Sequence, residues 1–222
     1  MENMNIIRVT GKGQLRLRPD MTRITLTLTG IEREYGDTLR VSSEKTDVLK
    51  ELFAGFGFDR SDLKTLNFNV DTEYESYQED NVWKQRFTGY RFNHILKVEF
   101  GSDNDRLGKI LYALANSDVD PQFNISYTVK DTEAAKNELL GKAVKDAQAK
   151  AGVLAGAAGK TLGDILSIDY SRGETVFESR PVNRLMAAKA MGAAEDSCSY
   201  DMNIEPDDID VSDTVTIVWE IR

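Results

Sequence analysis

The sequence predicts an α+β protein in which an antiparallel β-sheet with long hairpins packs against about three α-helices, the longest one rich in alanine. Several segments alternate apolar and polar residues with a period of two, which is typical of half-buried strands. Three other segments carry apolar residues at helical spacing. Turn residues separate strand patterns that follow one another directly, which favours antiparallel hairpins. We expect one domain over residues 1–222.

The opening stretch, RVTGKGQLRLRPDMTRITLTLTG, predicts two strands. The residues on both sides of Pro19-Asp20 alternate, so we expect a β-hairpin that turns there. Gly11 and Gly13 fall on the apolar face of the first strand. A phosphate loop needs its glycines between a strand and a helix. Here a strand follows, so the glycines indicate a bulge or a place where another element packs close to the backbone.

A helix is predicted next, with Asp37 as its cap and Gly55 and Gly57 near its end. A long hairpin should follow, with strands at about 63–77 and 87–100 and a polar tip at 78–81. The expected apolar stripe of the helix comprises Val41, Val48, Leu49, Leu52, Phe53 and Phe56.

The second half of the chain predicts a helix with a capping box at Ser102 and Asp105, and then a strand at about 123–129. Asp131 should open the longest helix, which runs to about Ala158. A short strand near 162–168 and a final strand near 211–221 complete the pattern. The expected stripe of the long helix comprises Leu140, Ala143, Val144, Ala147, Ala151, Leu154 and Ala155.

Composition limits the classes of partner. The chain has 222 residues, a formal net charge of −9 and a sequence pI of about 4.8. This charge argues against a nucleic-acid groove and against an anionic membrane surface. No apolar run approaches the ~20 residues of a membrane span. The first residues show no basic or apolar signal region, so we expect a cytoplasmic protein; an exported protein whose signal had been removed would look the same.

Histidine and cysteine, which often serve in catalysis and metal binding, occur once each in this chain. His94 is the only histidine and Cys198 the only cysteine, so neither a disulfide nor a usual zinc site can form. We interpret His94 as a core or edge histidine satisfied by one hydrogen bond. Gly159-Lys160-Thr161 reads as a helix end, and the acidic run 205–213 lacks the glycine and glutamate of an EF-hand. We therefore expect no catalytic, cofactor-binding or metal-binding residues and no enzyme.

Two segments are candidates for an interaction surface. The hairpin segment 73–87 is rich in aromatic residues, which fit either a contact surface or cross-strand pairs that stabilise the hairpin. The irregular segment 172–203 contains methionine and leucine, and it is either a partly mobile loop or an arm that docks on a neighbouring subunit. The predicted surface residues are Tyr74, Tyr77, Trp83, Phe87, Leu185, Met186 and Met191.

Four segments, in the same order along the chain, resemble the SIMPL-domain (YggE-like) family. They are VTGKGQLRLRPDMTRITLTL, TGYRFNHILKVEF, AKNELLGKAVKDAQAKAGVLAGAAGKTLGDILSI and IEPDDIDVSDTVTIVWEI. The resemblance implies an α+β fold and supplies no established catalytic residues. It also implies an association with oxidative-stress defence, often in exported bacterial proteins, and the family is named after a mammalian protein that associates with a signalling kinase. We expect this chain to differ from those relatives in lacking an export signal.

Three functional hypotheses remain open. The first is a non-enzymatic interaction or scaffold protein that forms homo-oligomers, with an unknown protein partner and a link to the stress response. The second is a module that binds a small molecule or a peptide through the aromatic hairpin or a cleft. The third is a hydrolase or isomerase that uses carboxylates which the sequence does not single out.

Overall fold

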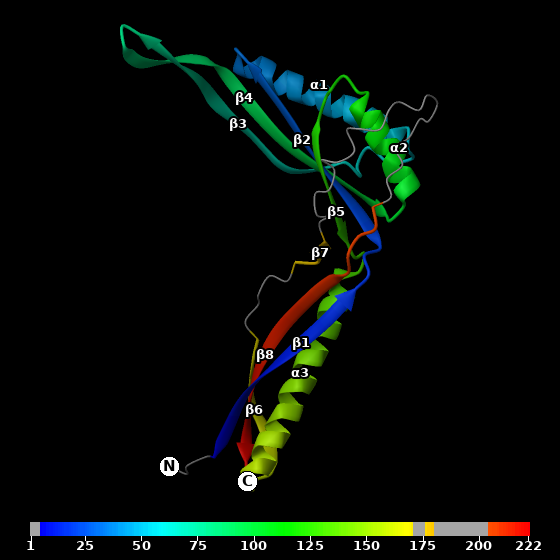
Figure 1. Ribbon diagram of the computed structural model, residues 1–222, viewed down its shortest axis with the longest axis vertical. Helices are drawn as coiled ribbons and strands as arrows, with labels where there is room; N and C mark the ends of the chain where they lie inside the picture. The colour runs from blue at the N-terminus through cyan, green and yellow to red at the C-terminus, as the bar shows by residue number, and fades with distance from the viewer. Residues whose placement is uncertain (1–4, 171–175, 180–203) are drawn as a thin grey trace. The chain divides into compact units, whose positions relative to one another are not determined.

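The computed structural model describes residues 5–170, 176–179 and 204–222 (Figure 1). In these ranges it contains two antiparallel sheets and three helices, which confirms the α+β prediction. The strands are β1 (Ile6–Leu17), β2 (Met21–Glu32), β3 (Lys64–Glu79), β4 (Val82–Gly101), β5 (Gln122–Thr128), β6 (Leu162–Asp169), β7 (Glu178–Ser179) and β8 (Ile209–Ile221). The helices are α1 (Tyr35–Ala54), α2 (Asn104–Ala115) and α3 (Thr132–Ala157).

The chain divides into two compact units. Unit 1 comprises Met1–Asp20, Thr128–Ser179 and Asp207–Arg222, and unit 2 comprises Met21–Tyr127 and Arg180–Pro206. The expectation of one domain over the whole chain stays a prediction.

Unit 1 is a sheet with strand order β1-β8-β6 and α3 packed on one face (Figure 1). Asp131 caps α3 by accepting a hydrogen bond from the backbone of Ala134 at 2.8 Å, as its position predicts. Leu154 is 53% exposed, so the predicted stripe is wrong at that position. The buried residues of α3 recur at every fourth position and are Ala135, Leu139, Ala143, Ala147, Ala151 and Ala155.

The two glycines of β1 mark the contact between the strand and α3. A side chain at Gly11 would meet the backbone of Ala143 and Ala147, and one at Gly13 would meet the carbonyl of Leu139. Between them, the N–H of Lys12 donates to Asp146 of α3 at 2.7 Å. The glycines therefore permit a close approach of helix and strand backbones, one of the two roles predicted for them.

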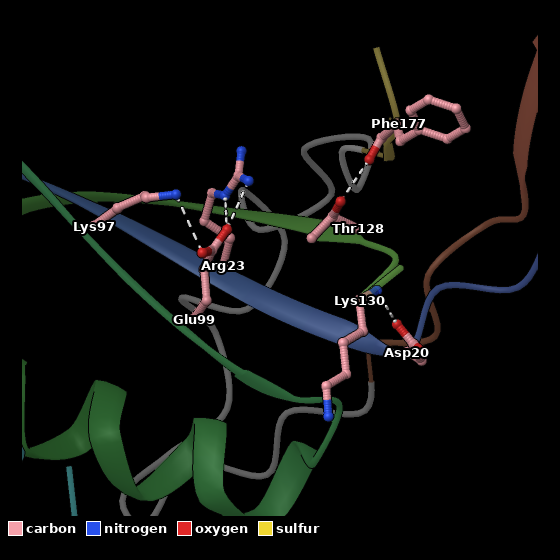
Figure 2. A network of polar contacts seen from close by, with 7 residues as sticks. All are labelled: Asp20, Arg23, Lys97, Glu99, Thr128, Lys130 and Phe177. Atoms are coloured by element: carbon pink, nitrogen blue, oxygen red, sulfur yellow. Dashed lines mark hydrogen bonds and ion pairs between the residues drawn. The ribbon is translucent and has the colours of Figure 1, made fainter. Parts of the chain in front are cut away.

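The predicted hairpin between the first two strands is wrong. β1 pairs with β8, from Ile6 opposite Glu220 to Leu17 opposite Ile209, while β2 pairs with β4. Asp20 is used differently from a hairpin turn: its N–H donates to the carbonyl of Thr128 at 3.1 Å. Its carboxylate accepts from the N–H of Lys130 at 2.7 Å (Figure 2). These bonds tie the end of β1 to the start of the α3 segment.

Unit 2 contains β2, β3, β4 and β5, which lie side by side in the order β3-β4-β2-β5. Helices α1 and α2 share one apolar core with the inner residues of β2 and β4. The long hairpin of β3 and β4 is confirmed. Its strands run closer to the tip than predicted, because only Asp80 and Asn81 form the loop, with φ of 51° and 61°. Positive φ at both positions is the geometry of a tight two-residue hairpin turn.

Helix boundaries and buried faces differ in detail from the predictions. The N-cap of α2 is Asp103, which accepts from the backbone of Arg106, so the predicted capping box at Ser102 is not used. In α1, Val48 is 46% exposed. Three polar residues of α1 take buried positions instead: Thr38, Ser42 and Thr46.

We expect Gly11→Ala to lower the free energy of unfolding by about 3 kcal/mol, because the added methyl group would force α3 away from β1. Gly152→Ala is the matched control. Gly152 lies in α3 with open space around it, so alanine should raise stability by up to about 1 kcal/mol through helix propensity. Urea unfolding followed by circular dichroism measures both. Equal stability of the two variants would contradict the close contact.

Candidate functional site

The β3–β4 hairpin extends beyond the rest of its sheet as a two-stranded ribbon, residues 74–87 (Figure 1). β2 ends at Glu32, opposite Tyr90 of β4, so the ribbon strands pair only with each other in the described part of the chain. At the base of the ribbon, Arg91 donates two hydrogen bonds to the carboxylate of Glu73, at 2.6 and 2.9 Å. This contact lowers the pKa of Glu73.

A bulge at the base of the ribbon decides which way its side chains point. The register shifts by one residue at Thr88, between the pairs Glu73–Gly89 and Tyr74–Phe87. Side chains alternate along a strand, so Phe87 and Tyr90 would point to opposite faces without the extra residue. The bulge turns Phe87 to the side of Tyr90, and their ring centroids lie 5.2 Å apart.

One face of the ribbon is aromatic and carries no charge. The pairing places Tyr74 opposite Phe87 and Trp83 opposite Gln78, with Ser76 and Gln85 between them. Tyr74 is 53%, Phe87 45% and Trp83 72% exposed. Trp83 lies beside the loop at the tip, so the least covered aromatic residue is also the farthest from the helices of unit 2.

The aromatic residues continue from the ribbon to the first residue of α1. Ring centroids are 5.8 Å apart for Tyr74 and Phe87, and 5.4 Å for Tyr90 and Tyr35, in each case edge to face. Edge-to-face contacts contribute about 0.5–1.5 kcal/mol each beyond the area that they bury. We call this surface the aromatic face; it comprises the contacting rings of Tyr35, Tyr74, Phe87 and Tyr90 together with Trp83, which lies on the same side of the ribbon nearer the tip.

The opposite face of the ribbon holds the charges. Glu75 pairs with Arg86 at 2.6 Å and Glu79 with Lys84 at 2.7 Å, and the Arg86 guanidinium lies 5.8 Å from the centroid of the Tyr77 ring. Each charged residue on this face thus has an oppositely charged partner across the strand pair.

The structure separates the predicted surface residues. Tyr74, Trp83 and Phe87 lie together on the aromatic face, whereas Tyr77 points to the charged face. Leu185, Met186 and Met191, with Cys198, lie outside the described residues. Sequence reasoning missed Tyr35 and Tyr90 as parts of the surface. Tyr90 lies two residues before the buried Phe92 on the same side of β4, and nothing in the sequence showed that the bulge would bring Phe87 to it.

His94 lies in a polar cluster between α1 and the sheet, and the prediction of one hydrogen bond is wrong. Its Nδ1 is 3.1 Å from the Thr46 hydroxyl and 3.4 Å from that of Ser42, and its Nε2 is 2.9 Å from the Thr65 hydroxyl. Thr46 donates its own proton to the Ser42 carbonyl at 2.7 Å. Nδ1 of His94 therefore carries a proton and donates to Thr46, and Nε2 accepts from Thr65.

The environment of His94 favours the neutral ring. Burial lowers the pKa of His94 below its ordinary value of 6.5, and the positive charge of Lys50 lowers it further. A neutral ring held by three hydroxyls explains why α1 can bury polar residues on its sheet-facing side. The arrangement positions α1 on the sheet.

A second polar cluster lies on the other face of the unit 2 sheet (Figure 2). Arg23 of β2 donates to Glu99 of β4 at 2.6 Å, and Lys97 donates to the same carboxylate at 3.1 Å. Burial opposes ionisation of Glu99, but the two cations outweigh it and lower its pKa. The Glu99 carboxylate thus links a cation of β2 with a cation of its own strand.

The other motifs considered in the sequence lie within strands or at the ends of regular elements. Gly11-Lys12-Gly13 lies inside β1, and Gly159, at φ 69°, ends α3 as predicted. The described part of the acidic run leads into β8, where Asp210 pairs with Arg16 at 3.0 Å. Among the described residues, no group of three His, Cys, Asp or Glu side chains could hold a metal ion. No helix in those residues is both long and apolar enough to cross a membrane.

A comparison with protein families identifies the family of the chain. A family model described as "SIMPL: Protein of unknown function (DUF541)" matches residues 7–219, nearly the whole chain. This confirms the resemblance found in the sequence. No curated protein matches the chain.

We expect the free energy of unfolding to fall as the pH drops from 7.5 to 5. The pKa of His94 is lower in the folded chain than the 6.5 of an exposed histidine, so the unfolded chain binds more protons below about pH 6.5. Stability is therefore full above this pH and is lost as the pH falls through the folded pKa.

A His94→Gln variant should show a flatter stability profile over this pH range, because glutamine does not titrate. The profile is measured by urea unfolding at each pH. Since the chain has one histidine, a single imidazole signal in NMR reports its pKa directly. A midpoint at or above 6.5, or identical profiles for the two proteins, would contradict the assignment.

Proposed function

Because the chain belongs to the SIMPL family, which has no assigned function, we propose a function from its own surfaces: a non-enzymatic interaction protein that self-associates through the aromatic face. The observation that carries the proposal is the division of the ribbon into an exposed aromatic face and an ion-paired charged face. The bulge at Thr88 aligns the ribbon with Tyr90 and Tyr35 and makes this surface continuous.

Exposure and composition support an interface. Tryptophan and tyrosine are enriched among the residues that dominate binding energy in protein complexes. Trp83, at 72% exposed, would gain most from burial. At about 25 cal/mol per Å² of apolar surface, burying one large aromatic side chain favours association by several kcal/mol before the entropic costs.

The charge distribution on the ribbon permits a second copy as the partner. Each chain carries a formal net charge of −9, so two copies repel each other at long range. Contact through the aromatic face adds no charge repulsion, because every residue on that side of the ribbon is uncharged. These residues are Tyr74, Ser76, Gln78, Trp83, Gln85 and Phe87. In a symmetric contact, Trp83 of one copy can pack against Tyr74 and Phe87 of the other.

The stress-response setting is part of the same proposal and rests only on the resemblance of the sequence to its family. A deletion strain tests this link. If it is sensitive to peroxide, and if the wild-type chain restores resistance while a variant that cannot associate does not, self-association is connected to the stress response.

Native mass spectrometry of the intact protein tests self-association. We expect the wild type to be a discrete oligomer and Trp83→Ser combined with Tyr74→Ser to lower the subunit number. Tyr77→Ser, which removes an aromatic side chain from the charged face of the same ribbon, should leave the mass unchanged.

Two outcomes would count against this function. Equal masses for the wild type and the double variant would remove the aromatic face as an association surface. A reproducible extra mass that is smaller than the chain, and that disappears in the double variant, would instead favour a module that binds a small molecule or a peptide there.

A further inference from the structure

The hydroxyl of Thr65 is hydrogen-bonded to the only histidine of the chain. Its Oγ1 lies 2.9 Å from Nε2 of His94, and the proton positions assigned above make Thr65 the donor. His94 is 9% exposed, whereas Thr65, in β3, is exposed to solvent. A buried base therefore contacts a hydroxyl that a molecule in solution can reach.

The orientation of the His94 ring is fixed through its other nitrogen. Nδ1 donates to Thr46 at 3.1 Å, and Thr46 donates in turn to the carbonyl of Ser42 at 2.7 Å. These bonds leave Nε2 as the proton acceptor and direct it to Thr65. A hydroxyl, a base and a group that orients the base form the arrangement that activates nucleophiles in covalent chemistry.

The His94 ring is in its proton-accepting form at neutral pH. Burial and the positive charge of Lys50 both lower its pKa, so the ring carries no charge there. Thr46 is neutral, so it orients the ring but does not stabilise an imidazolium as the aspartate of a Ser-His-Asp triad does. We therefore expect a slow reaction, which requires a reagent that is already activated.

Apolar side chains follow Thr65 along β3. The pairing of β3 with β4 shifts register between Thr65 and Asn67, so Leu66 is the extra residue of a bulge. Bulges are over-represented next to active sites, where they re-aim a side chain. Leu66 is 52% and Phe68 41% exposed, and the Phe68 ring lies edge to face with His94 at 5.1 Å. Exposed apolar surface beside the hydroxyl favours a reagent with an apolar group.

We propose that Thr65 is a covalent modification site for activated acyl esters, with His94 as the general base. Oγ1 of Thr65 attacks the carbonyl carbon of the ester, and its proton passes to Nε2 of His94. The bond from that carbon to the leaving oxygen then breaks, and His94 returns the proton to the leaving group. The products are an ester of Thr65 and a free alcohol. The reaction goes beyond self-association and does not depend on it.

The ester p-nitrophenyl butyrate tests the proposal, because the nitrophenolate that it releases is coloured. We expect a single butyryl group on the wild-type chain, located at Thr65 by fragmentation mass spectrometry. Thr65→Val has nearly the same shape but no hydroxyl, so this adduct should be lost. Thr65→Ser keeps a hydroxyl and should retain it.

The contribution of the base is measured in two ways. A general base accelerates such a step by about 10²–10⁴-fold, so His94→Gln should acylate Thr65 at least about 100-fold more slowly than the wild type. The second comparison needs no change at His94 and therefore does not depend on the folding of that variant. Thr72 is an exposed hydroxyl of the same strand, and in the wild type it should react more slowly than Thr65 by a similar factor.

Three results would overturn the assignment. Equal acylation of Thr65 and Thr72, or acylation of Thr65 that His94→Gln leaves unchanged, would show that His94 does not activate the hydroxyl. Nitrophenolate release that is as fast in Thr65→Val as in the wild type, without an adduct at Thr65, would place the reaction on other groups. The bond between Thr65 and His94 would then serve the fold alone.

Discussion

The close approach of α3 to β1 is the constraint on which unit 1 depends. At Gly11 and Gly13 the helix backbone occupies the space in which side chains would otherwise lie, and every fourth residue of the helix is buried there, all of them alanine except Leu139. Asp146 accepts the N–H of Lys12, which β1 would otherwise present at its edge. β1 is covered by α3 on one face and pairs with β8 along its length, and β2 pairs with β4, so the predicted hairpin between β1 and β2 does not form.

In unit 2, the polar cluster around His94 positions a helix on its sheet, as the glycines of β1 do in unit 1. His94 accepts and donates hydrogen bonds between α1 and β3, so the helix is positioned by specific bonds as well as by its apolar residues Leu49 and Phe53. The first residue of that helix is Tyr35, which contacts Tyr90. The position of α1 on the sheet therefore decides where the aromatic face begins, and the bulge at Thr88 decides how far along the ribbon it continues. The contacts that place α1 on the sheet therefore also shape the aromatic face.

The proposed association surface has to overcome an electrostatic problem. The chain is acidic, with a net charge of −9, and copies of it repel each other. On the ribbon the charged residues lie on one face and are paired across the strands, which leaves the other face neutral. Contact between aromatic side chains can then favour association, because no like charges are brought together at its centre.

The sequence by itself determined the α+β class, the family, the helices and most of the strands, because apolar periodicity and turn residues act over a few neighbouring positions. It also showed that Gly11 and Gly13 lie in a strand, and it indicated that residues 73–87 are an aromatic hairpin. Only the tertiary structure decided which strands pair, that polar residues of α1 face His94, and that Tyr77 and Trp83 lie on opposite faces. A period of two gives each residue a face, but it does not identify the partner strand. One bulged residue, Thr88, reverses the faces of every residue beyond it on its strand.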